Sequence, residues 1–197
     1  MKRNLWYKAT TWDRKGNILS GEEQPARSFL GLWNKIVWCH MVQPPVLSCP
    51  TTDIDGNYWP AGQGDTGHNF NMKGLANNSE LGIVIGTGDT PVTISDYALA
   101  AGINQGFGPG QMDYLVTNIY TPVVSDPNCD FFMSRQFANN SGGLITVKES
   151  GIYMLVERGI SPYTENNCCC IRDVFLTPQD VPDGGGITVE YTLRVTE

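Results

Sequence analysis

The chain has 197 residues, of which 41% are hydrophobic and only 17% are charged, and its 22 glycines and 12 prolines favour short strands joined by tight turns within one domain. Its net charge of −7 and the lack of any Lys/Arg cluster argue against nucleic acid as a partner, because nucleic-acid-binding surfaces are basic. No apolar run reaches the roughly 18 residues that a membrane-spanning helix needs, so we expect no membrane partner.

The first 24 residues mix aromatic and charged side chains around a turn pair, Gly16-Asn17. They predict either a short hairpin, with strands near Leu5–Trp12 and Ile18–Leu19, or an extended arm that adds a strand to a neighbouring subunit. The charged start is not followed by an apolar run or a cleavage site, so it does not predict a secretory signal. We therefore expect the protein to be made and kept in a cytosol until it is released.

One amphipathic helix is predicted from about residue 25 to residue 41. Pro25 suits its first turn, and Pro44-Pro45 ends it. Apolar residues recur inside it at three- and four-residue spacing: Phe29, Leu32, Trp33, Ile36, Val37 and His40. This stripe must be buried, either on the helix's own domain or in a neighbouring subunit. We group residues 1–42 as an N-terminal arm plus helix, and we expect that deleting them leaves a folded β domain that no longer assembles.

Residues 43–80 are rich in Pro, Gly and Asn and predict a loop region. Within it, Asp53–Asn57 resembles the start of a calcium loop. Tyr58 stands where that loop requires glycine, and Gly64 stands where it requires the bidentate glutamate. A turn centred on Asp55-Gly56 is the better interpretation, and neither a metal nor another cofactor is predicted.

From residue 81 onward the pattern predicts strand after strand. Gly82–Gly86 is a short apolar run, which suits a strand buried on both faces, and Met112–Val124 is long and rich in β-branched residues. Ile187–Val195 alternates strictly between apolar and polar residues after the turn signal Pro182–Gly186. Residues 81–197 therefore predict a mainly β fold, an antiparallel β-sandwich that is Ig-like or jelly-roll-like.

The sequence carries no recognisable catalytic site. Nucleophile, phosphate-loop and dinucleotide-binding motifs are missing, so we expect no enzyme activity. Six cysteines are candidates for disulfide bonds or for buried thiols: Cys39, Cys49, Cys129, Cys168, Cys169 and Cys170. Adjacent cysteines do not match the spacing of zinc ligands, so no metal site is predicted, and plain thiols are favoured over a late disulfide.

Several short segments of the C-terminal part form a distinctive series: Gly82–Val92, Ser95–Leu99, Arg135–Gly143, Ile145–Glu149, Gly151–Tyr153, Arg172–Val174 and Val181-Pro182. From about residue 81 onward this series resembles a group of tailed-bacteriophage virion structural proteins. The resemblance implies a role in particle architecture, with other virion proteins and further copies of the chain as partners in a homo-oligomer. It also implies location in the virion after assembly in the host cytoplasm, and it carries over no catalytic residue.

Large aromatic and apolar side chains anchor protein interfaces. The interface candidates are Trp6, Trp12, Phe29, Trp33, Ile36, Tyr58 and Trp59. We expect a non-enzymatic virion component that acts through subunit contacts, either a capsid decoration protein or an element of the neck, tail or baseplate. The alternative is a β-sandwich module that binds a host-surface glycan or protein. An exposed aromatic platform in residues 53–70 would favour the binding module, whereas burial of those residues between subunits would favour assembly.

Overall fold

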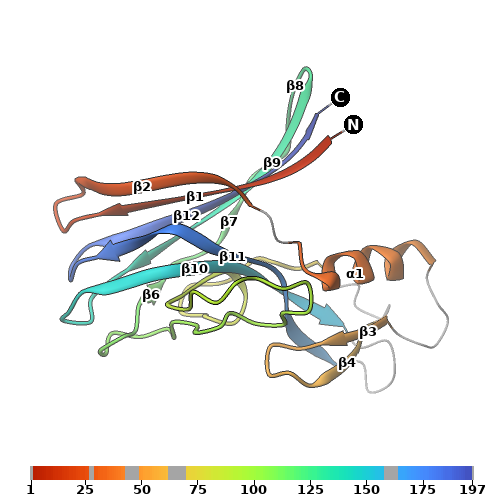
Figure 1. The fold of residues 1–197 in the computed structure, drawn as a ribbon, viewed down its shortest axis with the longest axis horizontal. Coiled ribbons are helices and arrows are strands. Elements are labelled where there is room, and N and C mark those ends of the chain that lie inside the picture. Colours follow the sequence, from red (N-terminus) through yellow and green to blue (C-terminus); the bar gives the residue numbers. More distant parts are fainter. Residues whose placement is uncertain (1, 27–28, 43–48, 62–69, 158–163, 197) are drawn as a thin grey trace.

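The computed structural model describes residues 2–26, 29–42, 49–61, 70–157 and 164–196. Within these ranges it contains twelve strands and one helix, and the strands pair antiparallel throughout (Figure 1). The prediction of a mainly β, antiparallel fold is therefore confirmed. The described residues include no helix that is long and apolar enough to cross a membrane.

The strands form a large sheet, a small sheet and one separate hairpin. The large sheet has the order β2-β1-β12-β9, and three short strands pair with the far side of β9. Its strands are β1 (Lys2–Trp12), β2 (Ile18–Ala26), β6 (Asp113–Tyr114), β7 (Asn118–Ile119), β8 (Val123–Ser125), β9 (Asn128–Ala138) and β12 (Gly186–Thr196). The small sheet has the order β11-β10-β5 and contains β5 (Gly82–Gly86), β10 (Ile145–Glu157) and β11 (Glu165–Val181). The hairpin pairs β3 (Cys49–Thr52) with β4 (Tyr58–Ala61).

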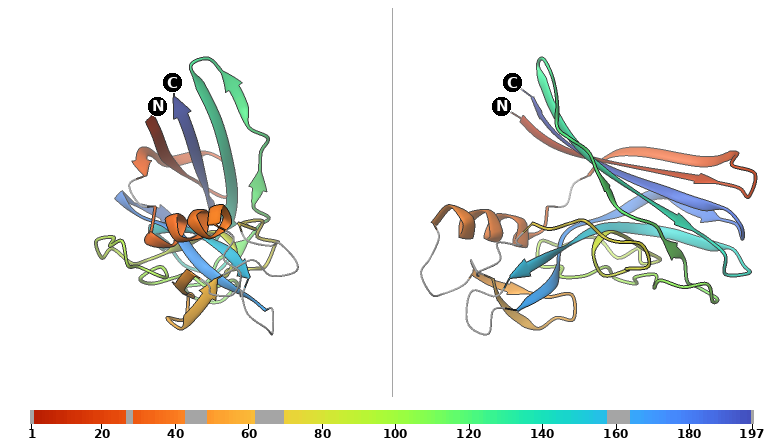
Figure 2. Two further views of the ribbon diagram at one scale, coloured as in Figure 1. Left: turned by 90° about the vertical axis from the view of Figure 1, so that its right-hand side faces the viewer. Right: turned by 180° about the vertical axis from the view of Figure 1, so that it is seen from behind.

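The two sheets face each other across one hydrophobic core (Figure 2). Alternate residues of the large sheet point into it, among them Ala9, Met133 and Val189, and the small sheet contributes Ile152 and Met154. Each of these side chains is at most 2% exposed. In the large sheet the buried residues alternate with more exposed ones, whereas β5 is buried along its whole length, so the small sheet is covered on both faces.

The alternation predicted for β12 is present, with Ile187 and Tyr191 both buried in the core. Further along β12, Leu193 and Val195 are only half buried. Here β1, β12 and β9 project beyond the small sheet together with β8, next to both ends of the chain (Figure 1). The large sheet is therefore longer than the core that it covers.

Residues 2–26 form a hairpin inside the large sheet, so the extended arm was the wrong one of the two alternatives. β1 lies between β2 and β12 and pairs with β12 over all 11 of its residues. Three of its side chains, Leu5, Tyr7 and Ala9, lie in the core. Deleting residues 1–42 would uncover that core and make β12 an edge strand, so we no longer expect the truncated chain to fold.

The helix α1 (Gly31–Val42) begins six residues later than predicted. Pro25 belongs instead to β2, the outermost strand of the large sheet, and edge strands tolerate proline because one side of their backbone has no ladder to lose. In the described turns of α1, Leu32 and Ile36 are buried in the core, whereas Asn34 is exposed. The described part of the stripe thus packs on the helix's own domain, which was one of the two alternatives, and the side chain of His40 lies outside the described residues.

The single strand predicted for Met112–Val124 is wrong. The segment instead touches β9 through the three short strands β6, β7 and β8. The Nε–H of Arg135 donates to the Leu115 carbonyl oxygen over 2.7 Å, and Pro122 has no N–H group to donate. Both features interrupt the ladder that a continuous strand would need.

Candidate interaction surfaces

A buried ion cluster joins the loop after β5 to both long strands of the small sheet. Arg172 of β11 donates to Glu149 Oε2 of β10 over 2.8 Å and to Asp96 Oδ2 over 2.6 Å. Glu149 Oε1 accepts the N–H groups of Gly88 (3.1 Å) and Ala101 (2.8 Å). A Cβ atom at position 88 would lie 2.4 Å from Glu149 Oε1, so only glycine allows this approach. The cluster therefore fastens the loop to the sheet.

Arg135, in the middle of β9, forms a second buried cluster. It is fully buried and donates five hydrogen bonds of 2.7–2.8 Å to main-chain carbonyl oxygens, those of Leu75, Asn78, Leu81, Ile83 and Leu115. Its guanidinium also lies 4.9 Å from the centre of the Tyr114 ring. Burial lowers the pKa of Arg135 to about 10, so the group is still a cation at neutral pH.

The charged residues of both clusters lie in the segments that carry the resemblance, which contain Asp96, Arg135, Glu149 and Arg172 together with Gly88. Their polar atoms bond to the protein's own loops and strands. In this structure these residues therefore stabilise the fold, and the contacts explain why such charged residues stand among apolar ones in the sequence.

The segment that resembles a calcium loop is a turn, as predicted. Asp53 Oδ1 accepts the N–H groups of Asp55 (3.0 Å) and Asn57 (2.8 Å), and its Oδ2 accepts the Asn166 side-chain amide over 2.7 Å. A cation would need those oxygens as ligands, whereas here they already accept N–H groups. Among the described residues, no three His, Cys, Asp or Glu side chains lie close enough together to hold a metal ion.

Four of the six cysteines are described with their side chains, and all four are free thiols, so they form no disulfide here. Cys168, Cys169 and Cys170 are buried in the hydrophobic core, and Cys129 is half buried on β9. Burial, with the Asp53 carboxylate nearby, raises the pKa of Cys168 to about 12, and burial also raises the pKa of Cys169 and of Cys170. The side chains of Cys39 and Cys49 lie outside the described residues.

The buried thiols are expected to be inert in the folded protein. In the Cys39→Ser/Cys49→Ser variant, a thiol reagent such as DTNB at pH 8 should titrate Cys129 and leave the other three untouched, because a thiol of pKa near 12 is only about 0.01% thiolate at that pH. After unfolding in guanidinium, all four thiols should react with the reagent. Adding Cys129→Ser should abolish the fast reaction, and rapid titration of three or four thiols in the native protein would contradict this assignment.

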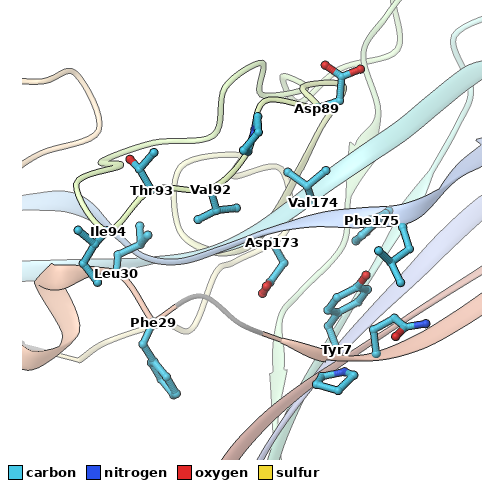
Figure 3. A pocket seen from close by; sticks show the side chains of 14 residues that line it. Tyr7, Phe29, Leu30, Asp89, Val92, Thr93, Ile94, Asp173, Val174 and Phe175 are labelled. Carbon is cyan, nitrogen blue, oxygen red and sulfur yellow. The ribbon is translucent and has the colours of Figure 1, made fainter.

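A cavity with a volume of about 570 Å³ opens between β2, β11 and the loop around residues 89–94 (Figure 3). Tyr7 and Phe175 stack along one wall, with ring centres 5.3 Å apart, and Asp173 points in from β11. Pro25 and Phe29 line its rim, and residues 27–28 between them lie outside the described residues. We therefore assign this cavity no ligand.

The predicted interface residues occupy different settings. Ile36 is buried in the chain's own core, and Phe29 and Trp33 are half buried against it. Phe29 also forms a β-bridge with Ile171, which adds the segment before α1 to the edge of the small sheet. Trp6 and Trp12 are half buried on β1.

The described part of the 53–70 segment does not form an aromatic platform. Tyr58 is 65% exposed, but Trp59 is half buried and its Nε1–H donates to the Val156 carbonyl oxygen over 3.0 Å. Phe70 packs against the core. Residues 62–69 lie outside the described residues. The segment therefore does not decide between a binding module and an assembly role.

A different surface, which the sequence did not single out, is the edge formed by residues 115–125 along β9; we refer to it as the 115–125 edge. Six of its large apolar side chains are between 37% and 78% exposed: Leu115, Val116, Ile119, Tyr120, Val123 and Val124. The segment contains no charged residue. β7 and β8 have β9 as their one described partner, so no described strand pairs with their other side.

Comparison of the chain with protein-family models, with curated proteins and with solved structures found no match. A function for this chain is therefore inferred from its own surfaces and buried clusters.

Proposed function

We propose that the protein is a non-enzymatic structural component of a tailed-phage virion, either a capsid decoration protein or an element of the neck, tail or baseplate. Its two facing sheets correspond to an Ig-like or jelly-roll-like β-sandwich. It acts through contacts with other virion proteins and with copies of itself, without nucleic acid or membrane, and it is located in the virion, which is assembled in the host cytoplasm. The sequence resemblance over residues 81–197 supports the virion role.

The 115–125 edge is the observation that carries the assembly role. Soluble monomers usually protect an open strand edge with charged residues or proline, because an apolar edge pairs with other chains. Pro122 is present, but charged residues are not, and Val124 is 78% exposed. A strand from a neighbouring subunit can add to such an edge through main-chain hydrogen bonds while the apolar side chains are buried.

The Arg135 cluster supports the same role because it holds the start of the edge in place. Arg135 holds the Leu115 carbonyl oxygen at the start of the edge, and Tyr120 N donates to the Phe132 carbonyl oxygen further along it. A contact surface that is already ordered loses less conformational entropy when a partner binds. Subunits that assemble into a regular particle benefit from such preorganisation.

Replacing Val123 and Val124 together by lysine is expected to abolish self-association. Both side chains are more than half exposed in the monomer, so the fold should keep its melting temperature within about 2 °C. At a subunit contact the two charges would lose their water without gaining partners, which should weaken association at least about 100-fold. Light scattering across a range of protein concentrations measures the effect.

Leu144→Lys is the matched control, because Leu144 is 63% exposed in the turn between β9 and β10, away from the 115–125 edge. It should leave the oligomer unchanged. A wild-type chain that stays monomeric at all concentrations, or an oligomer that tolerates both lysines, would refute the assembly role of the edge. Mass spectrometry of purified phage particles that encode the chain tests the virion role separately.

The second candidate function is binding of a host-surface glycan or protein. One observation favours it, an aromatic row on the outward face of the large sheet, and this row is independent of the 53–70 segment on which the sequence-based expectation relied.

A further inference from the structure

A row of aromatic side chains crosses the outward face of the large sheet, the face opposite to the one that buries Leu5, Tyr7 and Met133 in the core. Trp6 of β1 lies opposite Thr192 of β12, and Thr192 lies opposite Phe132 of β9. Tyr120 continues the row at the 115–125 edge, where its ring stacks on Phe132 with centres 4.4 Å apart. Trp6, Thr192 and Phe132 lie on the outward face because each is next to a residue buried in the core (Tyr7, Tyr191 and Met133), and Tyr120 is itself 41% exposed.

Trp6 and Phe132 enclose a shallow hollow of about 110 Å³, which we call the Trp6–Phe132 slot. The two residues stand on strands separated by β12, so their backbones are about 9.6 Å apart. Thr192 lies between them on β12 and is much shorter than either ring. The slot therefore has two aromatic sides and a floor with a hydroxyl group.

Charged groups close one end of the slot. Lys8, two residues beyond Trp6, pairs across the ladders with Glu190 and Glu23, and all three line the hollow. Lys8 Nζ and Glu190 Oε2 are 4.0 Å apart, and their side chains are 52% and 41% exposed, so this ion pair is loose and its groups can bond to a ligand. One ammonium and two carboxylates leave an excess of negative charge, which disfavours phosphate or nucleic acid.

A sugar ring matches this combination of groups. A pyranose has C–H faces that pack on aromatic rings and a rim of hydroxyl groups that bond to carboxylates, ammonium groups and hydroxyls. Two van der Waals contacts of about 3.5–4.0 Å, plus the thickness of a puckered ring, fill the spacing between the aromatic sides. An apolar side chain from a partner would instead desolvate Lys8 and Glu190 without replacing their hydrogen bonds to water, which is costly.

We propose that the Trp6–Phe132 slot binds one pyranose unit of a neutral glycan, which stacks between Trp6 and Phe132 and bonds through its hydroxyl groups to Lys8, Glu190 and Thr192. This site does not depend on the assembly role of the 115–125 edge. It stands on strands of a sheet, which hold side chains more rigidly than loops do.

Binding at a single slot is expected to be weak. The hollow is smaller than the roughly 300–1,000 Å³ of pockets that enclose a drug-sized ligand, so a dissociation constant near 1 mM is expected for a short oligosaccharide. Several copies of the chain on one particle would raise the overall affinity for a glycan-covered surface by about 10²–10⁴-fold.

Saturation-transfer NMR on the full chain tests the proposal with three neutral probes: cellotetraose, maltotetraose and chitotetraose. At about 10 mM, at least one should receive transfer at its ring C–H protons. Trp6→Leu and Phe132→Leu should each weaken that binding about tenfold or more, because each removes one aromatic side of the slot. Glu190→Gln should weaken it less. Trp12→Leu is the matched control, since Trp12 lies on the same strand but packs over Gly186 outside the slot.

Circular dichroism and thermal melting establish that each variant is folded, and Phe132→Leu with Glu190→Gln decides the question if Trp6→Leu does not fold. The proposal is overturned if none of the three sugars binds, or if both aromatic variants bind as the wild type does. It is also overturned if the aromatic variants change only the oligomer mass in light scattering, because that result assigns the slot to a protein partner.

Discussion

Arg135→Met is expected to prevent the protein from folding. The methionine fills a similar length of the core but leaves five main-chain carbonyl oxygens without their charged donor. Each buried acceptor left unsatisfied costs about 1–3 kcal/mol, and five of them approach the roughly 5–15 kcal/mol that stabilises a whole domain. Circular dichroism and the urea midpoint of unfolding provide the measurement.

Arg135→Lys gives a graded version of this test, because an ammonium group has three N–H donors and cannot span five acceptors. We expect it to fold with a loss of about 3 kcal/mol or more. Arg194→Met is the matched control: Arg194 pairs with Asp130 on an outward-facing part of the large sheet, with 40% of its side chain exposed, and should lose no more than about 1 kcal/mol. Equal effects at the two arginines would contradict the role given to Arg135.

The elements that the sequence predicts correctly are those with a local signal. The alternation of β12 and the apolar run of β5 each identify a strand without any knowledge of its partner. The turn at Asp53 is equally local, because its hydrogen bonds to Asp55 and Asn57 span only two and four residues.

The hairpin and arm alternatives for β1 could not be separated from sequence alone, because the deciding partner is at the other end of the chain. Leu5 pairs with Leu193, and no pattern within the first 24 residues indicates that contact. The predicted start of the helix was wrong for a different reason. Pro25 is equally suited to the first turn of a helix and to an edge strand, and the tertiary structure selects the strand.

Two features of the candidate surfaces have a signal in the sequence that the choice of interface residues did not use. The lack of charge between residues 115 and 125 is visible in the sequence, although its exposure depends on how short strands meet β9. Arg135 occupies an inward position in the alternation of β9, and a cation at such a position indicates a buried charge that needs acceptors. Its acceptors could not be predicted, because four of them lie 52 to 60 residues earlier in the chain.

Glu149→Gln is expected to lower the free energy of unfolding by about 3–5 kcal/mol, the usual cost of removing one partner from a buried ion pair. Glu149 is fully buried and Arg172 nearly so, and the substitution leaves the Arg172 cation with Asp96 as its carboxylate partner. The NH2 group of the new amide would also face donors, either Gly88 and Ala101 at the Oε1 position or Ala100 and Arg172 at the Oε2 position.

Asp89→Asn is the control for the Glu149 substitution, because Asp89 pairs with Lys148 in the same region but its side chain is 68% exposed. We expect that change to cost less than about 1 kcal/mol. Urea unfolding of the three proteins decides the matter. If Glu149→Gln is as stable as Asp89→Asn, apolar contacts hold the loop after β5. The ion cluster would then orient the loop without adding to the free energy of unfolding. If the expected difference is found, the same cluster that carries the resemblance is what fixes this loop on the small sheet.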